Sequence, residues 1–127
     1  MESGPPRSVA VLHLAPPLTH DQGLRLVGVE GELGWIDVQR WRGLLRGIIE
    51  DGATGLTVDL RGCRRIDTHC LSLLEAAAET LVGRGGGVNL VVFPGSGLAR
   101  RLRQLAGTAL PTYASASAAL LALGPVG

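Results

Sequence analysis

Short apolar runs alternate along most of this chain with longer segments that have a helical period. The runs suit buried strands, and the longer segments repeat their apolar residues every three to four positions, as amphipathic helices do. In chain order they fall at 24–29, 35–49, 56–60, 70–82, 88–93 and 97–106. Because successive strands with a helix between them are joined by right-handed crossovers, we expect these strands to be parallel. The pattern predicts an α/β fold with a mixed, mostly parallel sheet of about four to five strands and about four helices.

Weaker signals extend the sheet at both edges. An alternating run at 9–14 predicts an edge strand that pairs antiparallel, followed by turn-like residues at 18–23. The glycines within 31–34 are expected to end the strand before them. A last short strand is expected at 110–113, and Ser115 suits the N-cap of a final alanine-rich helix.

Each periodic segment has one apolar face that predicts how it packs. These faces are Val38, Trp41, Leu45 and Ile48, then Leu71, Leu74, Ala78 and Leu81, and last Leu98, Leu102 and Leu105. Ser96 suits the N-cap of the third segment. Trp35 lies just outside the first stripe, and it is a candidate partner contact if its side chain is exposed.

Composition bounds the class of protein. With 127 residues, 46% of them hydrophobic, the chain is long enough for one domain with a real core, which we expect at 8–124 after a flexible tail at 1–7. Its net charge of +1 gives no general attraction to nucleic acid. No apolar run approaches the length of a membrane span, and no signal peptide is visible, so we expect no membrane insertion and a cytoplasmic location. A monomer or a weak dimer is expected.

The most informative segment follows the second buried run. A short basic loop is expected at 61–66, and Asp67 and Thr68 then open a helix. The first turn of a helix has free backbone N–H groups, and Asp67 or Thr68 can accept a hydrogen bond from one of them as an N-cap. A strand that leads into a helix in this way places polar groups at one exposed end of the fold. Such an end suits a docking surface or a switch.

A basic patch is expected beside this helix start. The arginines that would form it are Arg61, Arg64 and Arg65 of the loop, with Arg40 or Arg42 of the preceding helix. A patch of this kind suits an acidic partner and speeds association. The alternative is a solvated loop without a binding role.

No catalytic or metal-binding constellation is predicted. Asp67, His69 and Cys70 include the residue types of a nucleophilic triad, but successive helical positions diverge by about 100° and do not converge on one atom. Cys63, Cys70 and His69 do not have the spacing of a metal site. We therefore expect no enzyme activity, no cofactor and no metal.

A glycine-rich turn at the end of the third apolar run is a second candidate site. Gly95, Ser96 and Gly97 precede a basic helix, and a helix N-terminus can bind phosphate or a nucleotide. The turn lacks the lysine and spacing of a mononucleotide P-loop. An ordinary capped turn is the alternative interpretation.

Several motifs in their order resemble the STAS family, which includes the bacterial anti-sigma factor antagonists. They are Val29-Glu30-Gly31-Glu32-Leu33, Leu56-Thr57-Val58-Asp59-Leu60-Arg61-Gly62, Ile66-Asp67, Asn89-Leu90-Val91-Val92-Phe93-Pro94, Arg101-Leu102-Arg103-Gln104-Leu105-Ala106-Gly107 and Leu110-Pro111-Thr112-Tyr113-Ala114-Ser115. The resemblance covers about residues 24–123. It implies a single STAS-type domain.

The resemblance also implies a partner and a site. Antagonists of this family bind an anti-sigma factor that is an ATP-binding serine kinase, and so free a sigma factor; the kinase phosphorylates the second hydroxyl residue of an Asp-Ser-Ser/Thr-Gly-Leu motif. Here Asp67 and Leu71 match, and Thr68 takes the place of the first hydroxyl residue. His69 stands at the acceptor position, and Cys70 replaces the glycine. A histidine has no hydroxyl for a serine kinase to phosphorylate.

Three interpretations of the altered motif follow. Thr68 is the phosphoacceptor, or the protein binds its partner constitutively, or it serves a STAS branch with another partner. The leading hypothesis is a regulatory module that docks an anti-sigma factor through Asp67–Leu74 without the usual phosphoswitch. The alternatives are an accessory subunit of a membrane transporter and a sensor of a nucleotide or another small ligand.

Overall fold

The protein is built around one five-stranded mixed sheet. The computed structural model describes residues 10–15, 23–106 and 110–123. The strands are β1 (Val11–Leu14), β2 (Leu24–Leu33), β3 (Gly55–Ile66), β4 (Gly87–Val91) and β5 (Thr112–Tyr113). They lie side by side in chain order; β1 pairs antiparallel with β2, and the other neighbours pair parallel. The predicted α/β fold with a mostly parallel sheet is confirmed.

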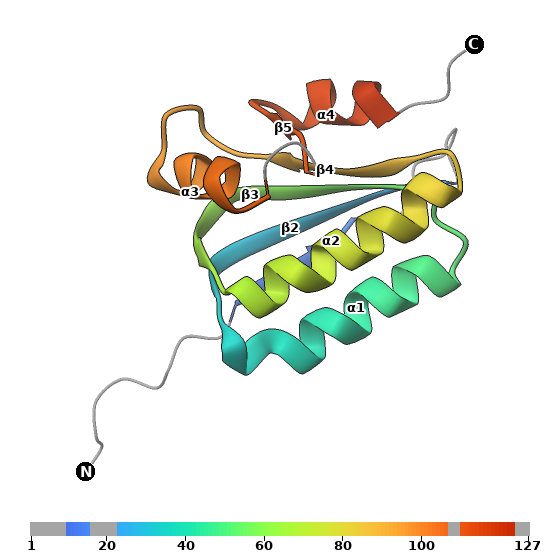
Figure 1. Cartoon of the computed structure of the whole chain (residues 1–127), viewed down its shortest axis with the longest axis horizontal. Coiled ribbons are helices and arrows are strands. Elements are labelled where there is room, and N and C mark those ends of the chain that lie inside the picture. Colours follow the sequence, from blue (N-terminus) through green and yellow to red (C-terminus); the bar gives the residue numbers. More distant parts are fainter. Residues whose placement is uncertain (1–9, 16–22, 107–109, 124–127) are drawn as a thin grey trace.

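Helices cover both faces of this sheet. The four α-helices are α1 (Val38–Glu50), α2 (Thr68–Gly83), α3 (Gly97–Ala106) and α4 (Ala116–Leu123), and a 3-10 turn (Trp35–Asp37) precedes α1. Figure 1 shows α1 and α2 together on one face and α4 on the other. It also shows α3 near the end of the sheet at which α1 and α2 begin. The starts of three helices therefore meet at one end of the domain.

The helix faces predicted from the apolar period are largely the buried ones. Trp41, Leu45 and Ile48 of α1 are buried, as are the four stripe residues of α2. The prediction is wrong at Leu105, whose side chain is 43% exposed. Helix α3 instead buries Ala99 beside Leu98 and Leu102, because it touches the domain only over its first turns.

Two strands are longer than predicted, and this corrects the expected basic loop. Strand β2 does not end at Val29 but continues through Gly31 to Leu33, and the predicted loop at 61–66 is the second half of β3. These halves pair with each other through two register shifts, and Gly31 adopts the left-handed backbone that such an irregularity needs. Cys63 and Ile66 are buried between exposed arginines. The exposed charges concealed the strand in the sequence.

The remaining element boundaries shift by a few residues. Strand β4 ends at Val91, two residues before the predicted end, and β5 is shorter than the predicted 110–113. The predicted caps of the last two helices are confirmed, because the hydroxyls of Ser96 and Ser115 accept backbone N–H bonds at 3.0 and 3.2 Å. The predicted tail at 1–7 and nearly all of the turn at 18–23 lie outside the described residues.

A buried polar chain attaches α4 to the sheet. The hydroxyl of Thr57 donates to the Asn89 amide oxygen at 2.7 Å, and the Asn89 amide nitrogen donates to the Ala119 carbonyl at 2.7 Å. Satisfied polar groups of this kind fix one arrangement of the packed elements. Within the described residues, none of the helices has the length and apolar character required to cross a bilayer.

Candidate functional site

The start of α2 is held in place by its own cap and by the neighbouring strand. The Asp67 N–H donates to the Leu33 carbonyl at 2.8 Å, and Asp67 Oδ1 accepts the His69 N–H at 2.8 Å. Asp67 is therefore the N-cap of α2, and its backbone is extended as a cap requires. The same carboxylate oxygen also lies 3.3 Å from His69 Nδ1.

Two residues of the predicted motif face the core. Cys70 is fully buried and Leu71 is 4% exposed. The Trp41 indole N–H donates to the Cys70 carbonyl at 3.0 Å, and the Cys70 thiol lies 3.6 Å from the Gly34 carbonyl, to which it donates. These contacts attach the first turn of α2 to α1 and to the end of β2. Cys70 and Leu71 thus position the surface residues of the motif from below.

The exposed part of the site combines polar and apolar side chains. Thr68 and His69 are exposed, and the His69 side chain is 81% accessible. Trp35 is a predicted partner contact on the condition that it is exposed. It is 65% exposed, and Ile36 beside it is 45% exposed. Large apolar side chains on a polar rim are typical of a protein-binding surface.

A shallow hollow of about 300 Å³ is lined by both Trp35 and Thr68. Its walls are Glu32, Gly34, Trp35, Arg65, Ile66, Asp67, Thr68 and Arg101. Arg101 was not predicted at this site, because the path of α3 across the end of the sheet has no local signal in the sequence. Among the residues of this hollow, Trp35 is the largest exposed apolar group, and Arg65 and Arg101 are the cations.

The predicted basic patch is only partly available to a partner. The Arg61 guanidinium donates two hydrogen bonds to the Asp59 carboxylate, one of them at 2.7 Å from Nη2 to Oδ2. This side-chain hydrogen bonding is the main reason that the pKa of Asp59 is lowered. Arg64 lies 3.6 Å from Glu32. Arg40 does not join the patch, because it binds the buried carboxylate of Asp37 at 2.8 Å. The patch beside α2 therefore consists of Arg65 with the unpredicted Arg101.

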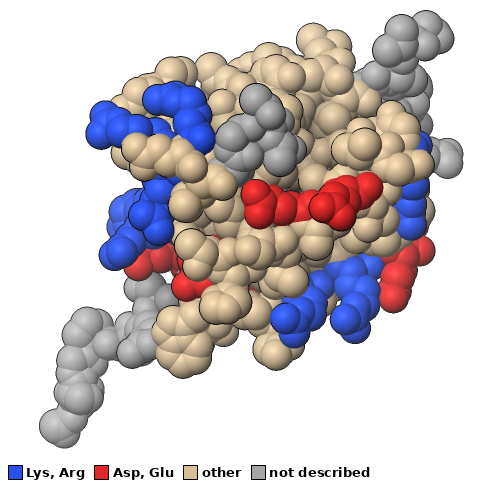
Figure 2. Space-filling model, viewed as in Figure 1, with Lys and Arg blue, Asp and Glu red and all other residues tan. Residues whose placement is uncertain are grey.

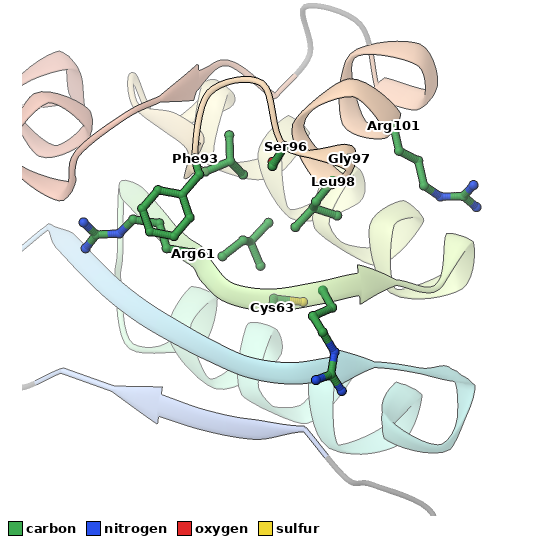
Figure 3. A pocket seen from close by; sticks show the side chains of 10 residues that line it. Arg61, Cys63, Phe93, Ser96, Gly97, Leu98 and Arg101 are labelled. Carbon is green, nitrogen blue, oxygen red and sulfur yellow. The ribbon is translucent and has the colours of Figure 1, made fainter.

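The second candidate site lies at the start of α3. Figure 3 shows Phe93 beside Arg61 at one end of a hollow of about 360 Å³, with Ser96, Gly97 and Leu98 along one wall and Arg101 extending away from it. The Ser96 hydroxyl accepts the Ala99 N–H, and the Ser96 N–H donates to the Phe93 carbonyl. In the turn at Gly95, Ser96 and Gly97, the serine hydroxyl therefore serves as the cap of α3.

The motif does not form a nucleophilic triad. Burial is the main cause that raises the pKa of Cys70 to about 12, so the thiol stays protonated at neutral pH. Burial also raises the pKa of Cys63, and both cysteines are free thiols. Asp67 is engaged as a cap. In the described ranges, no three histidine, cysteine or carboxylate side chains gather in the way that a metal ion needs.

Comparison with known proteins identifies the fold. No family model matches the chain, and no curated protein matches it. An anti-sigma factor antagonist from Mycobacterium paratuberculosis superposes with a TM-score of 0.73 at 22% identity over 90% of this chain and 93% of that one. Unphosphorylated SpoIIAA, also an anti-sigma factor antagonist, gives 0.66 at 14% identity over 88% and 96%.

A second SpoIIAA structure has the same fold in a different chemical state. Phosphorylated Bacillus SpoIIAA, a cell fate determinant, gives a TM-score of 0.64 at 14% identity over 90% of this chain and all (100%) of that one. The resemblance predicted from the motifs is therefore confirmed for the fold: this chain has the fold of the anti-sigma factor antagonists.

Proposed function

We propose that this protein is a regulatory docking module that works in the manner of an anti-sigma factor antagonist. Its partner would be an anti-sigma factor of the ATP-binding serine-kinase type, and binding would free a sigma factor. The observation that supports this most is a helix start that is fixed to the core and exposes Thr68 and His69, with the exposed Trp35 lining the same hollow as Thr68. A rigid surface with an aromatic anchor binds a partner at a low entropic cost.

The altered motif defines how the module would be regulated. SpoIIAA exists in phosphorylated and unphosphorylated forms. In this chain the side chain at the corresponding acceptor position is that of His69, which has no hydroxyl. Thr68 is the nearest hydroxyl, and it is exposed on the first turn of α2. We propose that binding is constitutive and that ATP does not release the partner through phosphate on this turn.

The same surface also fits a transporter accessory subunit, which would use it to bind an ATPase subunit. The sensor hypothesis has less support, because the Ser96 hydroxyl at the start of α3 already accepts the Ala99 N–H as the helix cap. The accessory-subunit hypothesis differs from the anti-sigma hypothesis in the protein that a bait would recover and not in the residues that bind it.

A pull-down with matched baits tests the proposal. The immobilised chain, its Trp35→Ala/Thr68→Arg variant and an Arg100→Glu control are exposed to lysate of the source organism with Mg-ATP. We expect the wild type and the control to retain an ATP-binding anti-sigma factor, and the double variant to lose it. Retention of transporter subunits in its place would support the accessory role. Equal recovery by all three baits would reject this surface as the docking site.

A further inference from the structure

The outer face of the two neighbouring helices α1 and α2 has two bands of opposite charge. Figure 2 shows basic side chains over α1 and acidic side chains along α2, with uncharged surface between them. Arg42 and Arg46 are exposed on α1, and on α2 Glu79 is exposed and Glu75 is partly exposed. None of these four belongs to an ion pair within the part of the chain that the structure describes. Arg42 donates to the Gln39 amide oxygen at 3.3 Å.

An apolar groove of about 280 Å³ runs between the bands. Leu45 and Ile49 of α1 and Leu73 and Ala77 of α2 line it, and Arg42, Arg46 and the exposed Glu50 of α1 border it. The outward side of α2 has only small side chains at Ser72, Ala76 and Thr80, all exposed and one turn apart. Another polypeptide can therefore approach the α2 backbone closely at this face.

We infer that a second copy of this chain occupies this face. A two-fold axis that lies in the interface and runs parallel to α1 and α2 places α2 of one copy over α1 of the other. Glu75 and Glu79 of each copy then face Arg42 and Arg46 of its mate, so the contact is self-complementary and closed. An axis across the helices would place α2 over α2 and oppose like charges, which disfavours association. The charge pattern therefore selects the parallel axis.

This arrangement has a consequence for the domain end at which α2 begins. A rotation about an axis parallel to the helices keeps both α2 starts at the same end of the dimer. Thr68 and Trp35 lie at that end and outside the groove. The dimer would thus present two copies of the candidate docking surface in one direction, which raises the avidity for a partner with two sites.

Sedimentation equilibrium over a wide concentration range at low and high salt tests the pairing. We expect the wild type to dimerise, and more weakly at high salt, because exposed ion pairs are screened. Arg42→Glu/Arg46→Glu and Glu75→Arg/Glu79→Arg should each associate at least about tenfold more weakly, since like charges then face each other. An equal mixture of the two variants should form a mixed dimer. Arg100→Glu/Arg103→Glu, a matched change on α3, should not alter association.

Crosslinking tests the axis separately. A bifunctional maleimide should link two copies of Ser72→Cys, because both positions lie at the same end, and the native thiols are buried. The inference would be overturned if the wild type stayed monomeric at all concentrations. It would also be overturned if the charge reversals did not weaken the dimer. A dimer in which Ser72→Cys fails to link to itself would overturn the axis. None of these results depends on the identity of a docking partner, so the inference and the proposed function can fail independently.

Discussion

The starts of α2 and α3 follow neighbouring parallel strands and are capped alike, yet they are held very differently. Asp67 caps α2 and Ser96 caps α3, each through a side-chain oxygen that accepts a backbone N–H. Beneath α2 the fully buried Cys70 is bound by the Trp41 indole. Helix α3 rests on Leu98, Ala99 and Leu102, and Leu105 is already exposed.

This difference indicates which end of the site can act as a rigid docking surface. Local opening requires little free energy where few apolar side chains are buried. We therefore expect the first turn of α2 to keep its shape without a partner. The start of α3 should open more readily.

Loss of Trp41 should have the largest effect. Trp41→Ala is expected to lower the free energy of unfolding by about 3–5 kcal/mol, because it leaves a cavity under α2 and removes the N–H that satisfies the Cys70 carbonyl. Urea denaturation measures the change. As a matched control, Leu102→Ala should also destabilise the fold, but without faster amide exchange in the first turn of α2. A loss below about 1 kcal/mol for Trp41→Ala would show that this anchor is unimportant.

Removing the two caps should differ in how far along the helix amide exchange becomes faster. Asp67→Ala and Ser96→Ala should each lower stability by about 1 kcal/mol, since each leaves one helix N–H without its acceptor. Hydrogen exchange should show a change confined to the first turn of α2 for Asp67→Ala. For Ser96→Ala the faster exchange should extend along α3. The reverse pattern would contradict the contrast between the two helix starts.

The exposed tryptophan should matter little for stability. Trp35→Ala is expected to change the free energy of unfolding by less than about 0.5 kcal/mol, because 65% of the residue is already in water. Thermal and urea denaturation of this variant beside Trp41→Ala give the comparison directly. A large loss would mean that Trp35 supports the fold and is not held ready for a partner.

The smallest effect concerns Asp59 of β3. The Arg61 hydrogen bond lowers the pKa of Asp59 in the folded state, so this pair stabilises the fold above the ordinary aspartate pKa, and the stabilisation disappears as the pH falls through the lowered value. Asp59→Asn should cost less than about 1 kcal/mol at pH 7, because the pair is partly exposed. The urea midpoints of the wild type and of Asp59→Asn should differ at neutral pH and converge as the pH is lowered. A difference between the two midpoints that grew as the pH fell would contradict this prediction.

The fold was predictable mainly where the sequence has a clear period. The apolar stripe with Trp41 and Leu45 and the one with Leu74 and Leu81 identified the inner faces of α1 and α2. The second half of β3 was not predictable, because its exposed arginines resemble a loop and its pairing depends on the irregular partner strand β2.

The candidate site was predictable only in part, for a related reason. Asp67, Thr68 and His69 are adjacent in sequence, so one motif revealed them. The proximity of Arg101 depends on the path of α3, and the burial of Cys70 depends on its contacts with Trp41 and Gly34. Local sequence patterns carry no information on either contact. The place of Arg101 at the site and the buried position of Cys70 therefore follow only from the tertiary structure.

The most direct test of the account is the mass of the intact chain after incubation with its purified kinase-type partner and Mg-ATP. His69→Ser, which restores a hydroxyl at the acceptor position, is the matched control. We expect the control to gain one phosphate group, while the wild type gains none and stays bound. Stoichiometric phosphate on Thr68 of the wild type, with release of the partner, would contradict a docking module that lacks the phosphoswitch.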